Sequence, residues 1–231
     1  MTIHKSHTKY YLKDGTEVPG VTTALHIVNL PALAPAANKL GFLGINSTTH
    51  WKTLADIGSI AHFLALQNAK GISKPDISEL GTFSQRQIDQ AENSFLSVLE
   101  WEKQHKIEDV LLETPMVSET FRYGGTLDRL CRLDGQDWLT LIDYKTGGVY
   151  KEHYWQMAAY AQLCLENDYT PKDGIILEIP RTNDEHFEPH HVGDLSLGFY
   201  PFLKCLELYT AIRNYDREIK MCTVAQGENH G

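Results

Sequence analysis

A change of residue pattern near position 107 divides this 231-residue chain. Residues 84–106 carry apolar side chains at three- and four-residue spacing, which predicts an amphipathic helix with one buried face. Ser84 and Gln87 are typical of a capping box at its start. The segments that follow are predicted to be three strands, a helix and a strand: 109–120, 123–134, 136–147, 152–167 and 173–181. This order predicts an α/β core with a short-range meander and one crossover.

Shorter elements are predicted outside this core. Asp14-Gly15 lies between β-prone residues and indicates a small hairpin over 10–22. The remaining predictions are a mostly helical 22–70 with breaks at Pro31, Pro35 and Gly41, a helix over 57–71 that ends at Gly71, an edge strand over 184–191, and a last helix from Asp194 to Lys220.

Composition places the chain among ordinary globular proteins. Hydrophobic residues make up 42% and charged residues 22%, which excludes wholesale disorder, a collagen-like repeat and a coiled-coil rod. The formal net charge of -9 argues against a general polycation that binds nucleic acid or anionic membranes through its overall charge. Nucleic acid binding through a local basic groove or through metal ions stays open.

The N-terminal residues and the cysteines bear on location and on metal chemistry. The chain starts without an apolar stretch of signal-peptide length, and the apolar segment 30–45 is interrupted by prolines, an asparagine and a lysine. We therefore expect a cytoplasmic protein without a membrane partner. Cys131, Cys164, Cys205 and Cys222 lack the local spacing of a zinc knuckle or an iron–sulfur cluster, so we expect neither.

Three polar residues near the strand ends predict a cation site. Asp143 and Lys145 lie two positions apart on the third strand, so their side chains point to the same side. Asp128 lies on the neighbouring strand, one hairpin earlier. Two carboxylates on adjacent strands form a hard-oxygen pocket that suits Mg²⁺ or Mn²⁺, and a lysine beside them can steady an attacking water in phosphodiester hydrolysis. The alternative is that Asp-x-Lys is an ordinary solvated strand end.

The following helix adds Gln156 and Tyr160, which share one face because they are four residues apart. On a face that overlooks the same pocket, a glutamine can hydrogen-bond a phosphate or a base edge, and a tyrosine can stack on a base. The alternative is a pair that only closes the helix onto the sheet.

Three consecutive motifs resemble a known nuclease family. GGTLDRL (124–130), LIDYKTG (141–147) and YWQMAAYAQL (154–163) are similar to the core of the PD-(D/E)XK nuclease superfamily. More narrowly, they resemble its RecB-like exonuclease branch, which includes phage exonucleases and the mitochondrial genome maintenance exonuclease. The resemblance covers roughly residues 84–181. It implies an α/β fold with a restriction-endonuclease-like αβββαβ core, a central mixed sheet flanked by helices, and an N-terminal helical region.

The resemblance implies one nuclease domain over 1–231. Within it, 1–83 forms the N-terminal hairpin and helices that carry His62, 84–181 forms the αβββαβ catalytic core, and 182–231 forms an edge strand and the C-terminal helix.

The resemblance also implies roles for individual residues. Gly58 and His62 match the family's Gly-x-x-x-His helix, whose histidine reaches the metal. The implied catalytic residues are Asp128, Asp143 and Lys145, and the implied metal ligands are His62, Asp128, Asp143, the carbonyl of Tyr144, and Glu113. The implied DNA-binding residues are Gln156, Tyr160, Arg122 and Lys151, with Arg129 and Lys52 as further groove-lining candidates. An imidazole among carboxylates favours Mn²⁺ over Mg²⁺.

Two departures from the family pattern limit the expectation. Leu127 stands where the superfamily's namesake proline precedes the first aspartate. The sequence also lacks a Walker A motif, so unwinding of DNA would need a helicase or recombination partner.

Together these features predict a divalent-metal-dependent DNA nuclease. The family analogy favours an exonuclease that acts on free ends or on single-stranded DNA, in recombination, repair or phage DNA processing. Two alternatives stay open: a structure-specific endonuclease, and a catalytically silent DNA-binding module of the same fold.

Overall fold

The computed structural model describes residues 8–28, 33–180 and 187–227. Its centre is a five-stranded sheet in the order β3-β4-β5-β6-β7. The strands are β3 (Ile107–Ser118), β4 (Tyr123–Leu133), β5 (Leu139–Thr146), β6 (Pro171–Ile179) and β7 (Glu188–Val192). β3, β4 and β5 form an antiparallel meander, β6 runs parallel to β5, and β7 runs antiparallel to β6. The predicted α/β fold with a mixed sheet is therefore confirmed.

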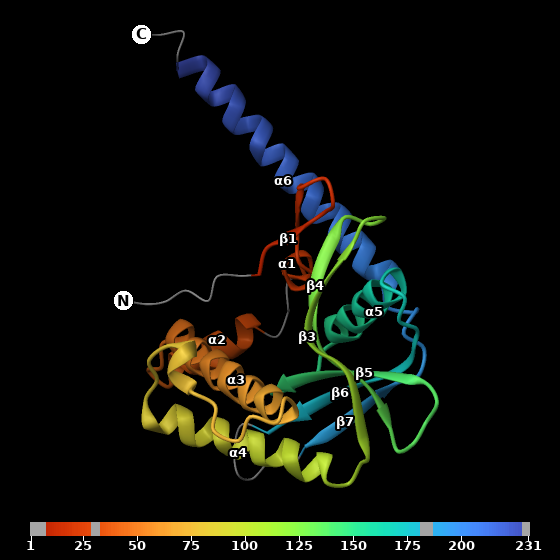
Figure 1. Ribbon diagram of the computed structural model, residues 1–231. Helices are drawn as coiled ribbons and strands as arrows, with labels where there is room; N and C mark the ends of the chain where they lie inside the picture. Colours follow the sequence, from red (N-terminus) through yellow and green to blue (C-terminus); the bar gives the residue numbers. More distant parts are fainter. Residues whose placement is uncertain (1–7, 29–32, 181–186, 228–231) are drawn as a thin grey trace.

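Helices cover both faces of this sheet (Figure 1). One face carries α1 (Val21–Leu25), α5 (Lys151–Glu166) and α6 (Phe199–Gly227), and the other carries α3 (Ser47–Ala69) and α4 (Gln85–Glu102). The alternation of side chains along a strand explains this division. Leu141 of β5 belongs to the core under α5, whereas the next residue, Ile142, belongs to the core under α3 and α4.

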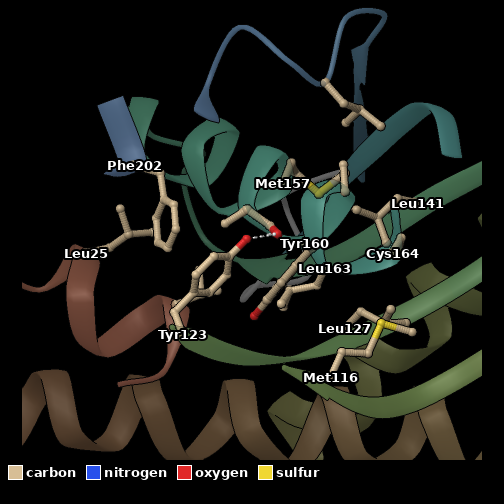
Figure 2. Packing of buried hydrophobic residues seen from close by; sticks show 14 of the residues in the cluster. Leu25, Met116, Tyr123, Leu127, Leu141, Met157, Tyr160, Leu163, Cys164 and Phe202 are labelled. Atoms are coloured by element: carbon tan, nitrogen blue, oxygen red, sulfur yellow. Dashed lines mark hydrogen bonds between the residues drawn. The ribbon is translucent and has the colours of Figure 1, made fainter. Parts of the chain in front are cut away.

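The core under α5 joins segments that are far apart in the sequence. Met157 and Leu163 of α5 lie over the sheet, and Phe202 of α6 lies near Leu25 of α1 (Figure 2). Tyr123 connects the two groups because its hydroxyl donates to the backbone carbonyl of α5 at 2.8 Å, while its ring meets Phe202 edge-on at 4.7 Å. The crossover helix is thus fixed to the sheet and packs against α1 and α6.

The predicted hairpin and the predicted helix cap are both present. β1 (Tyr10–Tyr11) pairs antiparallel with β2 (Glu17–Val18), and Asp14 Oδ1 accepts a 2.8 Å hydrogen bond from the Thr16 amide in the turn. At the start of α4, Ser84 and Gln87 form the reciprocal capping box. Both motifs are local, which explains why the sequence alone predicted them.

The predicted helix breaks at Pro35 and Gly41 are wrong, and so is one predicted helix start. α2 (Leu33–Phe42) contains both Pro35 and Gly41, so neither residue breaks it; Pro35 lies in the first turn, where a missing amide hydrogen leaves no bond unmade. Pro31 lies outside the described residues. The helix predicted over 57–71 begins earlier, at Ser47, because Asn46 Oδ1 accepts from the Thr49 amide at 3.0 Å. A short 3-10 helix, η1 (Ile77–Leu80), precedes α4.

The C-terminal elements also differ from their predicted bounds. β7 begins at Glu188, and the first part of the strand predicted over 184–191 lies outside the described residues. α6 begins at Phe199 instead of Asp194, because the Asp194 carboxylate accepts from the Ser196 amide at 2.9 Å and forms a turn there. The distal part of α6 extends away from the sheet (Figure 1). Among the described helices, none is both long and apolar enough to span a membrane.

The N-terminal hairpin docks on β4 at a glycine. The Gly124 amide donates to the Pro19 carbonyl at 2.9 Å, and a Cβ at Gly124 would overlap the Tyr10 side chain. A bare backbone at position 124 is therefore what lets the hairpin lie against the sheet.

Gly124→Ala should lower the free energy of unfolding by about 1–3 kcal/mol, because the added methyl group displaces Tyr10. The control is Gly41→Ala, at a helical position where a Cβ meets nothing within 4 Å. This control should be neutral or stabilising by about 0.5–1 kcal/mol. Urea denaturation of the three proteins checks both changes. Equal midpoints for Gly124→Ala and the parent would show that the hairpin does not pack here.

Candidate active site

The β4–β5 ladder ends at two aspartates. The strands pair through Cys131–Thr140, Leu130–Leu141 and Arg129–Ile142, so the next step of the register sets Asp128 opposite Asp143. At this point the Asp128 side chain replaces a strand partner, since its Oδ2 accepts a 3.0 Å hydrogen bond from the Tyr144 amide. The two carboxylates predicted from the sequence therefore lie opposite each other at the point where the pairing of β4 and β5 ends.

His62 of α3 lies against Asp128 at the end of this pairing. Its Nε2 lies 2.8 Å from Asp128 Oδ1. One turn earlier, Gly58 lies so close to the end of β5 that a Cβ would overlap Thr146 Oγ1. The Gly-x-x-x-His spacing thus has a physical basis: the glycine allows close approach of α3 to β5, and the histidine one turn later meets the carboxylate.

Asp143 is fixed by two neighbours. Only 1% of its surface is exposed. Its Oδ2 forms an ion pair with Lys145, which confirms that the two side chains share one side of β5. Its Oδ1 accepts a 3.4 Å hydrogen bond from Gln156 Nε2, and the same nitrogen donates to Tyr160 Oη at 2.8 Å. In the described structure Asp143 Oδ2 accepts no well-aligned hydrogen bond, although Lys145 lies against it.

A second glycine brings α5 to the sheet. A Cβ at Gly125 would come within 2.7 Å of the Tyr160 ring, so the glycine lets this ring lie directly on β4. Tyr160 and Gln156 are both buried. Their hydrogen bond to each other orients the amide that holds Asp143. This geometry supports the structural alternative for the pair, and their contact with DNA stays a prediction.

The charges at the site separate the pKa values of the two carboxyl groups. Burial, together with the repulsion from Asp128, raises the pKa of Asp143 to about 6, against the attraction of Lys145 and His62. Burial also disfavours charge on Asp128, but the attraction and hydrogen bond of His62, with help from Lys145 and the Tyr144 amide, lower its pKa. For His62, burial is outweighed by the attraction and hydrogen bond of Asp128, and the pKa is raised.

Arg129 supports the site from the opposite face and does not line a groove, so this part of the prediction is wrong. Only 3% of its surface is exposed. Its guanidinium binds both carboxylate oxygens of Asp109, at 2.5 and 2.9 Å, and also pairs with Glu102. A further bond of 3.1 Å joins it to the Tyr144 hydroxyl. This buried network fixes the residue that lies between Asp143 and Lys145.

Glu113, the further predicted metal ligand, lies on β3. The register places Glu113 opposite Asp128, since Leu112 pairs with Arg129 and Thr114 with Leu127. Glu113 has a positive φ of 45°, and its carboxylate forms a 2.8 Å ion pair with Lys70.

The predicted basic DNA contacts are dispersed. Arg122 is exposed in the turn between β3 and β4, about 20 Å along the strand from Asp128 at the usual rise per residue. Lys151 is exposed at the start of α5, with its ammonium 5.7 Å from the Trp155 ring. Lys52 pairs with Asp56 at 2.9 Å. Of these three, Lys151 lies on the helix that carries Gln156 and Tyr160.

A cavity of about 420 Å³ opens beside the aspartates. His62, Tyr144 and Lys145 form part of its wall, and Glu152 and His153 at the start of α5 form another part. Glu152 and His153 were not among the residues predicted from the sequence. Their position three to four residues before Gln156 is the signal that places them at the same end of α5.

A further group of metal-binding side chains lies on β6 and β7. The ligand atoms of Glu178, Glu188 and His190 all lie within 4.8 Å of one another. Glu178 is the register partner of Lys145 on one side and of Glu188 on the other. This group was not predicted from the sequence, because only the strand register brings the three residues together.

Comparison with known proteins decides the family. A sequence model described as the PD-(D/E)XK nuclease superfamily matches residues 48–195. The chain belongs to this superfamily. The matched span contains His62, Asp128, Asp143, Lys145 and Gln156. The protein is accordingly a nuclease, and nucleases of this superfamily use divalent metal ions.

Other comparisons give weaker likenesses. An alkaline exonuclease from Laribacter hongkongensis has a TM-score of 0.41 and 15% identity, covering 75% of this chain and 91% of that chain. A candidate exonuclease from Eubacterium rectale has a TM-score of 0.42 and 12% identity, covering 66% of this chain and 68% of that chain. A search of curated proteins found no match.

Arg129→Met should destabilise this nuclease by about 1–3 kcal/mol, because it leaves the partly buried carboxylate of Glu102, the more exposed carboxylate of Asp109 and the Tyr144 hydroxyl without their hydrogen-bond donor. The matched control is Arg132→Met on the same strand, where the side chain is exposed and the change should stay within about 0.5 kcal/mol. Chemical denaturation followed by circular dichroism measures both. If both variants unfold at the same denaturant concentration, the network does not support the site.

Proposed function

We propose that the protein is a divalent-metal-dependent DNA nuclease in which Asp128, Asp143 and Lys145 carry the catalysis. The observation that supports this most directly is the opposition of Asp128 and Asp143 at the end of the β4–β5 ladder. Two carboxylates in direct register repel each other, and burial strengthens that repulsion. The ammonium of Lys145 lies against Asp143, and His62 Nε2 lies 2.8 Å from Asp128 Oδ1.

The donor set fits a hard divalent cation. Asp128 and Asp143 offer carboxylate oxygens, and Asp143 Oδ2 is buried without a well-aligned hydrogen bond. His62 Nε2 and the Tyr144 carbonyl are the further ligands that we propose. Glu113, opposite Asp128 in the strand register, is a further proposed ligand, which would have to leave its ion pair with Lys70. Oxygen ligands suit Mg²⁺, and the imidazole favours Mn²⁺. A cation held here would polarise the phosphate and stabilise charge on the leaving oxygen.

The protein's own groups supply position and charge. The ammonium of Lys145 faces the cavity of about 420 Å³, where it can attract a phosphate and orient a water for in-line attack. Gln156 holds the Asp143 carboxylate in place through its amide. Arg129 fixes the side chain of Tyr144 from the other face of the sheet, which keeps the backbone between the two catalytic residues rigid.

The mode of action that we propose is exonucleolytic, on free DNA ends or single-stranded DNA. This rests on the RecB-like motifs in the sequence, and it extends to a cytoplasmic role in recombination, repair or phage DNA processing with a separate helicase or recombination partner. Lys151 at the start of α5 is the basic residue that we assign to the DNA path near the site, with Arg122 as a distant contact.

Lys145→Ala and Asp143→Asn should each reduce cleavage of end-labelled single-stranded DNA at least about 100-fold, because each removes charge that acts on the reacting phosphate. Lys106→Ala is the matched control, since Lys106 is exposed and pairs only with Glu108 in the described contacts. Product formation is measured on gels with Mg²⁺, Mn²⁺ or EDTA.

Two results of this experiment would contradict the proposal. Cleavage that persists in EDTA would exclude dependence on a divalent cation. Tight DNA binding without cleavage in any metal would favour the silent binding module.

Linear and circular single-stranded DNA of the same sequence should behave differently. An exonuclease needs an end, so the linear strand should be degraded while the circle stays intact. Product lengths with the label at the 5′ end and at the 3′ end then give the polarity. Cutting of the circle at a rate similar to that of the linear strand would identify a structure-specific endonuclease instead.

A further inference from the structure

A second cavity, of about 490 Å³, lies between α1 and the start of α5. Its volume lies in the range of small-ligand sites, about 300–1,000 Å³. Residues of α1 and the chain that follows it form one wall, and α5 forms the other. The lining residues are Thr22, Leu25, His26, Ile27, Val28, Leu33, Glu152, His153 and Gln156.

This cavity adjoins the candidate active site. Glu152 and His153 line both it and the cavity that contains Lys145. Gln156 provides a second connection, because its Nε2 donates to Asp143 while its side chain also lines the second cavity. A molecule that extends from one cavity into the other would therefore pass the start of α5.

The chemistry of the second cavity does not suit a phosphate. None of its described lining residues is a lysine or an arginine. Burial, together with the nearby charge of Lys145, lowers the pKa of His153 to about 4, so this imidazole is neutral at pH 7. Glu152 has a buried Oε2 without a hydrogen-bond partner among the described residues, and an anion beside it would be repelled.

The same walls suit a flat, neutral group with hydrogen-bond donors. Leu25, Ile27 and Val28 provide apolar surface. Gln156 is 6% exposed, and its Nε2 is already bonded to Asp143 and Tyr160, so its Oε1 is the polar atom left for a ligand. Among the described residues, this oxygen accepts no hydrogen bond. An unpaired acceptor on a largely buried side chain is best satisfied by a ligand that donates a hydrogen to it.

We propose that this cavity is a base pocket, which takes one unpaired nucleobase of the strand whose neighbouring phosphate lies at Asp128, Asp143 and Lys145. The inference rests on the proposed nuclease function and adds the part of the substrate that is recognised next to the cut. A base can enter only when it is unstacked and unpaired, so the base pocket restricts the enzyme to single strands or frayed ends. Gln156 then links occupation of the base pocket to the position of Asp143.

The first test scans a single abasic site along an end-labelled single-stranded DNA. We expect kcat/KM for one defined bond to fall about tenfold when the abasic site lies at one fixed position from that bond, and to change little elsewhere. Loss of a base removes the group that fills the base pocket but keeps every phosphate, so general electrostatic binding is unchanged.

The second test fills the base pocket. Thr22 is exposed and is the second residue of α1, so Thr22→Trp places an indole at the mouth without burying a new group. The matched control is Thr48→Trp, since Thr48 is also exposed, is the second residue of α3 and lines neither cavity. Thr22→Trp should slow cleavage of the intact strand about tenfold but leave cleavage of the sensitive abasic strand unchanged, whereas the control should match the parent on both.

A binding measurement separates failure of this inference from failure of the proposed function. Strands with 2-aminopurine at successive positions are titrated with protein in Ca²⁺, and an increase in fluorescence at one position reports an unstacked base. We expect this signal in the parent and in Thr48→Trp, and its loss in Thr22→Trp. Cleavage without any position-specific abasic effect, or a fluorescence signal that Thr22→Trp retains, would overturn the base pocket. A signal without cleavage would retain the base pocket and reject the nuclease proposal.

Discussion

The opposition of a buried carboxylate, Asp143, and a partly buried one, Asp128, at the end of the β4–β5 ladder determines how the rest of the site is built. Asp128 and Asp143 occupy facing positions where pairing stops, and the Asp128 side chain takes over the Tyr144 amide that a strand partner would otherwise bind. Buried like charges are unfavourable unless cations lie beside them. His62 and Lys145 supply part of that compensation. Burial and the repulsion from Asp128 still raise the pKa of Asp143, against the attraction of Lys145 and His62.

Two glycines let the helices approach the sheet closely enough for His62 and Gln156 to make their contacts with the aspartates. Gly58 lets α3 approach the end of β5, and Gly125 lets the Tyr160 ring lie on β4. A methyl group at either position would move a helix away from the sheet, and His62 or Gln156 would move with it. Close packing of helix on sheet is therefore a condition for the chemistry, because hydrogen bonds of about 3 Å tolerate little displacement.

The sequence predicted those parts of the molecule that depend on local pattern. Alternation along β5 predicted that Asp143 and Lys145 share a side, and the ion pair confirms it. The burial of Arg129 escaped prediction because its partner Asp109 lies on another strand, and only the β3–β4 register brings the two together. The Glu178 cluster escaped for the same reason. Contacts set by strand register depend on the whole sheet, and a single sequence does not specify that register.

Gln156 illustrates why two interpretations of one residue need not exclude each other. Its spacing from Tyr160 fitted either a contact with DNA or a bond that closes the helix onto the sheet. In the structure the amide nitrogen makes the structural bonds, to Asp143 and Tyr160, and this leaves the amide oxygen for the second cavity. An amide carries a donor group and an acceptor group at fixed geometry. A base that engaged the oxygen, as we propose, would act on the same amide group that binds the Asp143 carboxylate, so recognition of the base and alignment of Asp143 would be coupled through one side chain.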